Sequence, residues 1–191
     1  MALMNKFKKI FWILCNKLLF KHLGKKSYIK KPLMLNGKKY ISLGNNVNFR
    51  EGARIECVDK WLDKKFEPSI IVGDNTVFEQ HIHLTTAGTI EIGKNCSILA
   101  RTMITSIEHD YSKINIPILK QKINVSNVKI GDNCFIGMDV KIFPGVSIGD
   151  NVIIGANSIV MCDLPSYTVA VGTPAKVIKK YDFGKGLWIK I

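Results

Sequence analysis

Residues 1–40 contain no aspartate or glutamate, although they hold eleven of the 28 basic side chains. The rest of the 191-residue chain carries the other 17 basic side chains and 15 acidic ones, so the net charge of +13 arises mainly at the N-terminal end. Charge confined in this way, without a recognised reading module, gives no support for a nucleic-acid partner. A lysine-rich segment free of acid is instead typical of contact with an anionic membrane surface.

Long apolar runs and paired cysteines are also missing. The apolar run Ile10–Cys15 is far too short to span a bilayer, and no small-x-small cleavage site follows it. The sequence therefore predicts neither a membrane-spanning helix nor a secretory signal. Its five cysteines include no CxxC pair, which favours small buried side chains over disulfides or metal ligands and fits a reducing cytoplasm. The chain also lacks the GxGxxG pattern of a nucleotide-binding βαβ unit.

An apolar residue recurs every six positions across residues 130–165. A period of six is produced neither by an amphipathic helix nor by a simple strand, whereas it is typical of a parallel β-helix. Gly-Asp-Asn triplets between the apolar positions suit tight corners, because these residues accept backbone angles that branched residues resist. The pattern predicts an all-β solenoid. The leading residues of the six hexads are Ile130, Ile136, Ile142, Ile148, Ile154 and Val160.

The same phase is found earlier in the chain, after Pro32, with interruptions. A charged and aromatic stretch at 57–69 leaves the repeat, and a slip of two residues falls within 85–89. A longer segment, about 105–129, is expelled from the coils and contains His109. Long loops in compact domains are often functional, and an imidazole can act as a general base near neutral pH.

Residues 1–26 are expected to hold a basic amphipathic helix, with a helical pattern over residues 3–22. Its apolar side chains follow i, i+3, i+4, i+7 spacing, and its lysines lie elsewhere on the helix. Such a helix can lie in a membrane interface or pack on its own solenoid, and the sequence leaves both open. Residues 27–180 are expected to form the solenoid domain, and residues 181–191 a C-terminal tail. The expected apolar stripe consists of Phe7, Ile10, Phe11, Leu14 and Leu18.

The hexads, the segment ITSIEHDYSKINIPILKQ at 104–121 and the segment VGTPAKVIKK at 171–180 together resemble the hexapeptide-repeat acyltransferases. They are most similar to the sugar O-acetyltransferases that modify O-antigen and capsular polysaccharide. The resemblance implies a left-handed parallel β-helix and a homotrimer with active sites between subunits. It also implies acetyl-CoA as co-substrate, no metal, and a sugar or glycan acceptor. With the cysteine usage, we expect a cytoplasmic enzyme, held at the inner face of the membrane if the helix binds lipid.

The resemblance also assigns roles to single residues. His109 matches the catalytic histidine, His81 an acceptor-binding position, and the Met138 N–H a donor to the thioester oxygen. The short turn at 85–89 lacks the acidic residue that the maltose-type enzymes use for free sugars, which argues against a small free sugar as acceptor. The positions implied for acyl-CoA binding are Phe135, Ala156, Met161, Pro174 and Lys176.

Three alternatives remain open. The first is N-acetylation of a nucleotide-linked amino sugar. The second is a metal-dependent enzyme like the γ-type carbonic anhydrases, with His81, His83 and His109 as ligands, although the His-x4-His pair of that family is absent. His81 and His83 would share a face if they lay in one strand. The third is a solenoid that serves as a scaffold without catalysis.

Overall fold

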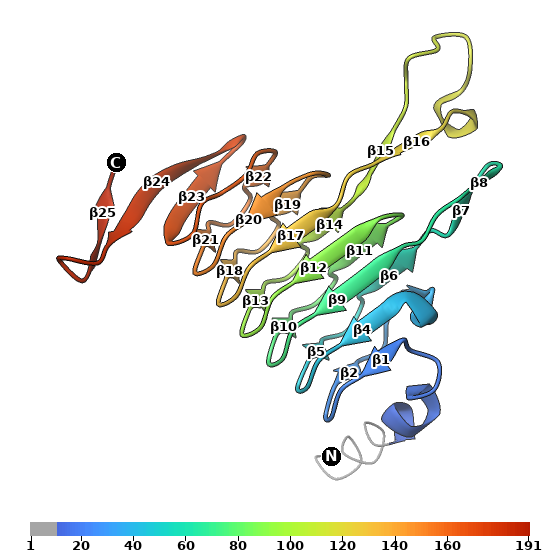
Figure 1. Cartoon of the computed structure of the whole chain (residues 1–191), viewed down its shortest axis with the longest axis horizontal. Coiled ribbons are helices and arrows are strands. Elements are labelled where there is room, and N and C mark those ends of the chain that lie inside the picture. Colours follow the sequence, from blue (N-terminus) through green and yellow to red (C-terminus); the bar gives the residue numbers. More distant parts are fainter. Residues whose placement is uncertain (1–10) are drawn as a thin grey trace.

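A computed structural model describes residues 11–191 as a three-sided solenoid that advances coil by coil along the chain (Figure 1). Each coil gives one short strand to each of three sheets, here called the first, second and third faces. Neighbouring coils pair in parallel, with partner residues in register. The predicted parallel β-helix is therefore confirmed.

The strands of each face follow one another along the solenoid. The first face holds β1 (His22–Leu23), β4 (Ile41–Leu43), β9 (Ser69–Val72), β12 (Thr89–Ile92), β17 (Val128–Ile130) and β20 (Ser147–Ile148). The second holds β2 (Tyr28–Ile29), β5 (Asn48–Phe49), β10 (Val77–Phe78), β13 (Ser97–Ile98), β18 (Phe135–Ile136), β21 (Ile153–Ile154), β23 (Thr168–Gly172), β24 (Ala175–Asp182) and β25 (Leu187–Lys190). The third holds β3 (Met34–Asn36), β6 (Arg54–Cys57), β11 (His83–Thr86), β14 (Met103–Thr105), β19 (Lys141–Ile142) and β22 (Ile159–Val160).

The core is a stack of the hexad leaders. All six leaders between Ile130 and Val160 are at most 2 % exposed, because alternation along each strand turns them inward. Phe49 and Phe78 stack in neighbouring coils with ring centroids 3.8 Å apart. At the corner between the first and second faces, left-handed asparagines form a ladder of side-chain hydrogen bonds that includes Asn75 Nδ2 to Asn95 Oδ1 at 3.2 Å. A Cβ at Gly131 of the same corner would collide with the Asp150 carboxylate, so glycine is needed there.

Two excursions leave the solenoid from one corner, between the third and first faces. The first is the hairpin of β7 (Lys60–Trp61) and β8 (Lys64–Lys65), which confirms the predicted departure at 57–69. The second begins with β15 (Ile107–His109) and returns through the short 3-10 helix η2 (Ile118–Lys120) and β16 (Ile123–Val125). Between them, the coil of β11 turns tightly at 86–88. Figure 1 shows the hairpin and this expelled loop on the same side of the solenoid.

The N-terminal expectation was partly wrong. Within the described residues the helix ends at Asn16, and the chain turns through 17–20 to enter β1 at His22. Phe20, at the end of this turn, is buried in the core. The solenoid starts one coil earlier than expected, since Leu23, Ile29 and Leu35 already repeat at six. In the described part of the chain, no helix is both long and apolar enough to cross a bilayer.

The C-terminal tail is ordered rather than loose. Residues 187–190 form β25, which pairs antiparallel with β24 and extends the second face. The cysteines divide into two groups. Cys57, Cys96 and Cys134 are buried as expected, whereas Cys15 and Cys162 are exposed, and all five are free thiols.

Candidate active site

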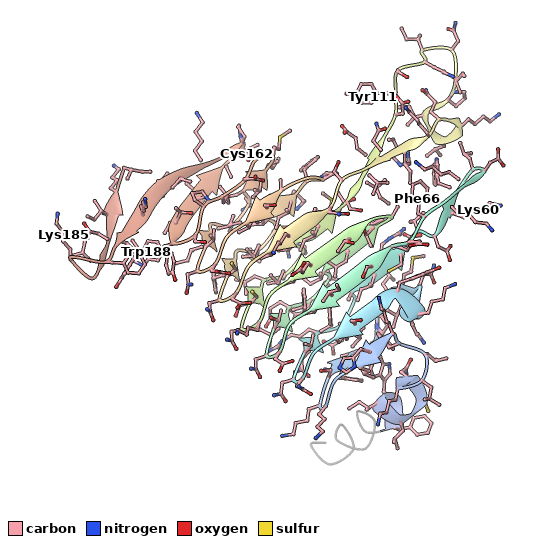
Figure 2. The ribbon with its side chains drawn as sticks, in the orientation of Figure 1. Lys60, Phe66, Tyr111, Cys162, Lys185 and Trp188 are labelled. Carbon is pink, nitrogen blue, oxygen red and sulfur yellow. The ribbon has the colours of Figure 1, made fainter. Side chains whose placement is uncertain are left out.

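A cavity of about 380 Å³ lies between the β7–β8 hairpin and the expelled loop. Its floor is the outer surface of the third face, and the tight turn at 86–88 leaves the space above that floor open. Figure 2 marks the two excursions by Phe66, at the base of the hairpin, and Tyr111, on the expelled loop. The lining residues are Arg54, Glu56, Val58, Trp61, His83, Thr85, Met103, Thr105, Ile107, His109 and Ile123.

The floor of the cavity is polar and ordered by strand register. His83 pairs in register with Arg54, and Thr85 with Glu56, across β11 and β6. The Arg54 guanidinium contacts the Glu56 carboxylate at 2.6 Å, and its Nε is buried without a partner in the described chain. His83 Nε2 lies 2.7 Å from Thr85 Oγ1. These groups offer both donors and acceptors to a polyhydroxylated ligand.

The pKa of His83 is shifted by its surroundings. Burial, followed by the nearby positive charge of Arg54, lowers the pKa of His83 below its ordinary value, while Glu56 opposes the shift. The imidazole is therefore neutral at neutral pH, and it can donate from one ring nitrogen and accept at the other.

His109 stands at the wall of the cavity. It is half-buried in β15, where it pairs with Ile123 of β16 at the neck of the expelled loop. The indole of Trp61 meets its ring edge to face, with centroids 5.1 Å apart. His109 Nδ1 is buried and has no hydrogen-bond partner among residues 11–191. The predicted base thus lines a cavity with a polar floor, from which a hydroxyl group can be presented to it.

The acidic neighbours of His109 face elsewhere. Asp110 accepts the Ser112 N–H at 2.9 Å and lies 3.7 Å from Lys122 Nζ. The Ser112 hydrogen bond, aided by Lys122, lowers the pKa of Asp110. Glu108 is exposed. Neither carboxylate is placed to orient the imidazole.

Most of the residues predicted to bind acyl-CoA lie at or beside another corner, between the second and third faces. Met138 and Ala156 occupy equivalent turns there, since Asn157 N–H donates to Met138 O at 2.9 Å. The amide of Met138 donates to no acceptor in the described chain, and Ala100 and Ala156 repeat this in their own turns. The unpaired backbone N–H of Met138 is therefore a consequence of the turn geometry that these coils share. Phe135, the first residue of β18, is 45 % exposed. Met161 is 62 % exposed and follows β22, so it lies toward the corner between the third and first faces. Pro174 is exposed in the turn into β24, and Lys176 is exposed at the start of that strand.

His81 also lies at this second corner and does not line the cavity. It has a left-handed backbone with φ of 58°, and its N–H donates to Glu51 O. His81 and His83 therefore do not share a strand face, contrary to the expectation. Across residues 11–191, no three His, Cys, Asp or Glu side chains are grouped in a way that could hold a metal ion.

Sequence reasoning missed most of the cavity, although its signal was present. Arg54 and Glu56 flank the hexad leader Ile55, and His83 and Thr85 flank the leader Leu84. In a strand, both neighbours of an inward residue point outward. These side chains therefore stack on the third face directly below the expelled loop.

A solenoid with a histidine-bearing loop at one corner and free amides at the next defines an acyltransferase of the hexapeptide-repeat class. A model of the family "Bacterial transferase hexapeptide (six repeats)" matches residues 127–161. The Escherichia coli K12 protein named "Putative lipopolysaccharide biosynthesis O-acetyl transferase WbbJ" is 30 % identical over 169 residues, which cover 85 % of this chain and 83 % of that protein. The chain belongs to the hexapeptide-repeat transferase family.

Two further relatives extend the comparison. Galactoside O-acetyltransferase of Escherichia coli K12 is 28 % identical over 86 % of this chain and 66 % of its own length. The crystal structure of AntD, an N-acyltransferase from Bacillus cereus in complex with dTDP and 3-hydroxybutyryl-CoA, matches with a TM-score of 0.74. That match is 25 % identical and covers 90 % of this chain and 89 % of AntD.

Proposed function

We propose that this chain is an O-acetyltransferase that moves the acetyl group of acetyl-CoA to a sugar hydroxyl, in a cell-surface polysaccharide or its precursor. The observation that supports this best is His109 in the wall of a cavity whose floor carries the polar side chains Arg54, Glu56, His83 and Thr85. The names of WbbJ and galactoside O-acetyltransferase support a saccharide acceptor.

The reaction uses two groups of the protein. His109 takes the proton of the sugar hydroxyl as its oxygen attacks the thioester carbonyl carbon. The carbonyl oxygen gains negative charge in the tetrahedral intermediate, and the Met138 N–H is the donor that stabilises it. The carbon–sulfur bond then breaks, and the departing thiolate takes the proton held by His109. No covalent enzyme intermediate is required.

We propose that a second subunit completes this site. Within one chain, His109 and Met138 lie at different corners of the coil, and none of the expected acyl-CoA positions lines the cavity. A homotrimer brings the loop corner of one chain against the Met138 corner of the next, together with His81. Sedimentation equilibrium tests this, because a fully active monomer contradicts it.

N-acylation of a nucleotide-linked amino sugar is the second candidate. This candidate is favoured by the structural match to AntD, an N-acyltransferase solved with dTDP, which covers 90 % of this chain. A general base at His109 would serve an amine as well as a hydroxyl. Thioester cleavage measured across free sugars, lipid-linked saccharides and nucleotide-linked amino sugars separates the two. Turnover only with amino sugars would overturn the O-acetyl proposal.

The catalytic assignment is tested with His109→Ala. We expect kcat to fall by about 10²- to 10⁴-fold, the range for a lost general base, with acetyl-CoA binding largely kept. His22→Ala is the matched control, because His22 is exposed in β1 at the far end of the solenoid. Near-normal turnover of a folded His109→Ala protein would refute the role.

We also propose that the N-terminal segment attaches the enzyme to anionic lipid of the cytoplasmic leaflet. Phe11, Leu14 and Leu18 are 70 %, 68 % and 95 % exposed, while Trp12 and Ile13 of the same segment pack against the core. The helix thus contacts the solenoid on one side and presents apolar side chains on the other. The exposed lysines that surround this apolar surface are Lys17, Lys21, Lys25 and Lys26.

Vesicle flotation tests this attachment. We expect binding to anionic vesicles at low salt and release at high salt, because the attraction is screened within about 10 Å at 0.1 M salt. Leu18→Glu should abolish binding without unfolding the protein, and Leu33→Glu, at an exposed site outside this surface, is the control. Failure to float under any condition would leave the helix as a cap of the solenoid.

A further inference from the structure

Trp61 of the β7–β8 hairpin makes two contacts with the expelled loop. Trp61 packs edge to face on His109, with ring centroids 5.1 Å apart, and its Nε1–H donates to Gln121 O at 2.9 Å. It therefore contacts both the imidazole and the chain that returns from the loop. We propose that Trp61 is a positioning residue for His109, an inference that rests on the proposed role of His109 as base.

No hydrogen bond or ion pair within residues 11–191 orients the imidazole ring. His109 Nδ1 has no hydrogen-bond partner in the described chain, Asp110 is engaged by Ser112 and Lys122, and Glu108 is exposed. A base is commonly oriented by a hydrogen bond to a third group. Within residues 11–191, His109 has no such hydrogen bond, and packing against the Trp61 indole restricts the movement of its ring instead. Aromatic pairs of this geometry are directional, so the contact restrains orientation as well as position.

Trp61 restrains the neck of the expelled loop as well as the His109 ring, because it also bonds to Gln121. The buried Gln121 side chain accepts the Lys113 N–H at 3.1 Å and donates to Lys113 O at 2.9 Å and Ile116 O at 2.8 Å. It thereby closes the expelled loop just beyond His109. Trp61 bonds to the backbone of this same residue, so the hairpin holds the loop neck and the imidazole together.

The hairpin is itself anchored to the solenoid. At its base, Phe66 N–H donates to Asp59 O at 2.9 Å, and the Tyr40 hydroxyl donates to Asp59 Oδ2 at 2.9 Å. Tyr40 packs against the core. A continuous path of contacts therefore runs from the core through Asp59 and Trp61 to His109. This path gives the departure at 57–69 a function that its surface charge does not explain.

The test combines kinetics with a readout that needs no turnover. The chain has four histidines, so ¹³C-histidine labelling gives four ring signals, and His109→Ala identifies one of them. We expect Trp61→Ala to move that signal and leave the other three in place, because the ring current of the indole is lost. Trp61→Phe should keep part of the shift. Trp188→Ala, in β25 at the opposite end of the chain (Figure 2), should change none of the four.

In the acetyl-transfer assay, we expect Trp61→Ala to lower kcat by about 10- to 100-fold, since a displacement near 1 Å can cost 10²-fold. The KM for acetyl-CoA should stay within twofold, and Trp61→Phe should recover most of kcat. In a His109→Ala background, Trp61→Ala should cause no further loss, as expected for residues that act as one unit.

An unmoved His109 signal, or a kcat within twofold of wild type in Trp61→Ala, would overturn the proposal. A further loss in the double variant would also overturn it, because Trp61 would then act independently of His109. If His109→Ala itself retains full activity, the proposed base is wrong. The ring signal then still decides whether Trp61 holds the imidazole, so the two failures are distinguishable.

Discussion

Replacing Gln121 with alanine should open the expelled loop while the solenoid stays folded. The Gln121 side chain makes three hydrogen bonds, all to the backbone of Lys113 and Ile116, and it is 6 % exposed. At a net value of about 1 kcal/mol each, they stabilise the closed loop by about 3 kcal/mol. This corresponds to roughly a 100-fold rise in the population of the open loop.

Limited proteolysis measures that population directly. Every residue of 111–120 is exposed, and the segment offers Lys113 and Lys120 to trypsin. When opening is fast relative to cleavage, the cleavage rate follows the open fraction. We therefore expect cleavage in this segment to accelerate by about 100-fold in Gln121→Ala. The thermal midpoint should change little, since the loop lies outside the core.

Two variants sharpen the interpretation. Gln121→Glu keeps an acceptor for the Lys113 N–H but loses both donors, so its cleavage rate should lie near that of the alanine variant. Gln80→Ala removes a partly exposed glutamine whose side chain has no hydrogen bond in the described chain, and it should cleave like wild type. If wild type and Gln121→Ala are cut equally fast, the amide does not close the loop and the reasoning is refuted.

Two further predictions concern Lys176, beside the Met138 corner, and His83, on the floor of the cavity. If the Lys176 ammonium contacts a phosphate of the coenzyme, Lys176→Ala should weaken acetyl-CoA binding by about tenfold in calorimetry. A truncated donor that lacks the nucleotide should lose less affinity in the same variant. Equal losses for both donors would place Lys176 away from the nucleotide. Because the pKa of His83 is lowered, the unfolded chain binds more protons at this site, and stability is lost as the pH falls below about 6.5. The free energy of unfolding, measured with urea, should fall less between pH 7 and pH 5 in His83→Gln than in wild type or in His22→Gln. Equal decreases in all three proteins would contradict the lowered pKa of His83.

The coils were predictable because their signal is local and repeated. Each leader such as Ile136 or Ile148 is defined by its neighbours six positions away, and all were buried as expected. The first coil was missed because its first leader, Leu23, comes directly after a segment, residues 3–22, that fits a helical period. In the structure the helix ends at Asn16, and the following turn leads into β1 with Phe20 buried.

The cavity could be predicted only in part. His109 was found from its loop and its resemblance to known enzymes, and the floor was available from the phase of the hexads. Trp61 could not be found in this way. Its role depends on the hairpin and the loop leaving the same corner two coils apart, and on the tight turn between them. The sequence marks where a segment leaves a solenoid, but not where it lies afterwards.

The separation of the two corners has a consequence for how such enzymes diversify. Every coil passes the same three corners, so lengthening or shortening a turn at one corner leaves the registers of the other two unchanged. In this chain, the corner between the third and first faces carries the β7–β8 hairpin, then a short turn, then the expelled loop in three successive coils. The turns at the Met138 corner are uniform. Under the proposed function, acceptor choice would then change by insertion and deletion at the loop corner alone, while the proposed thioester-binding edge keeps its geometry.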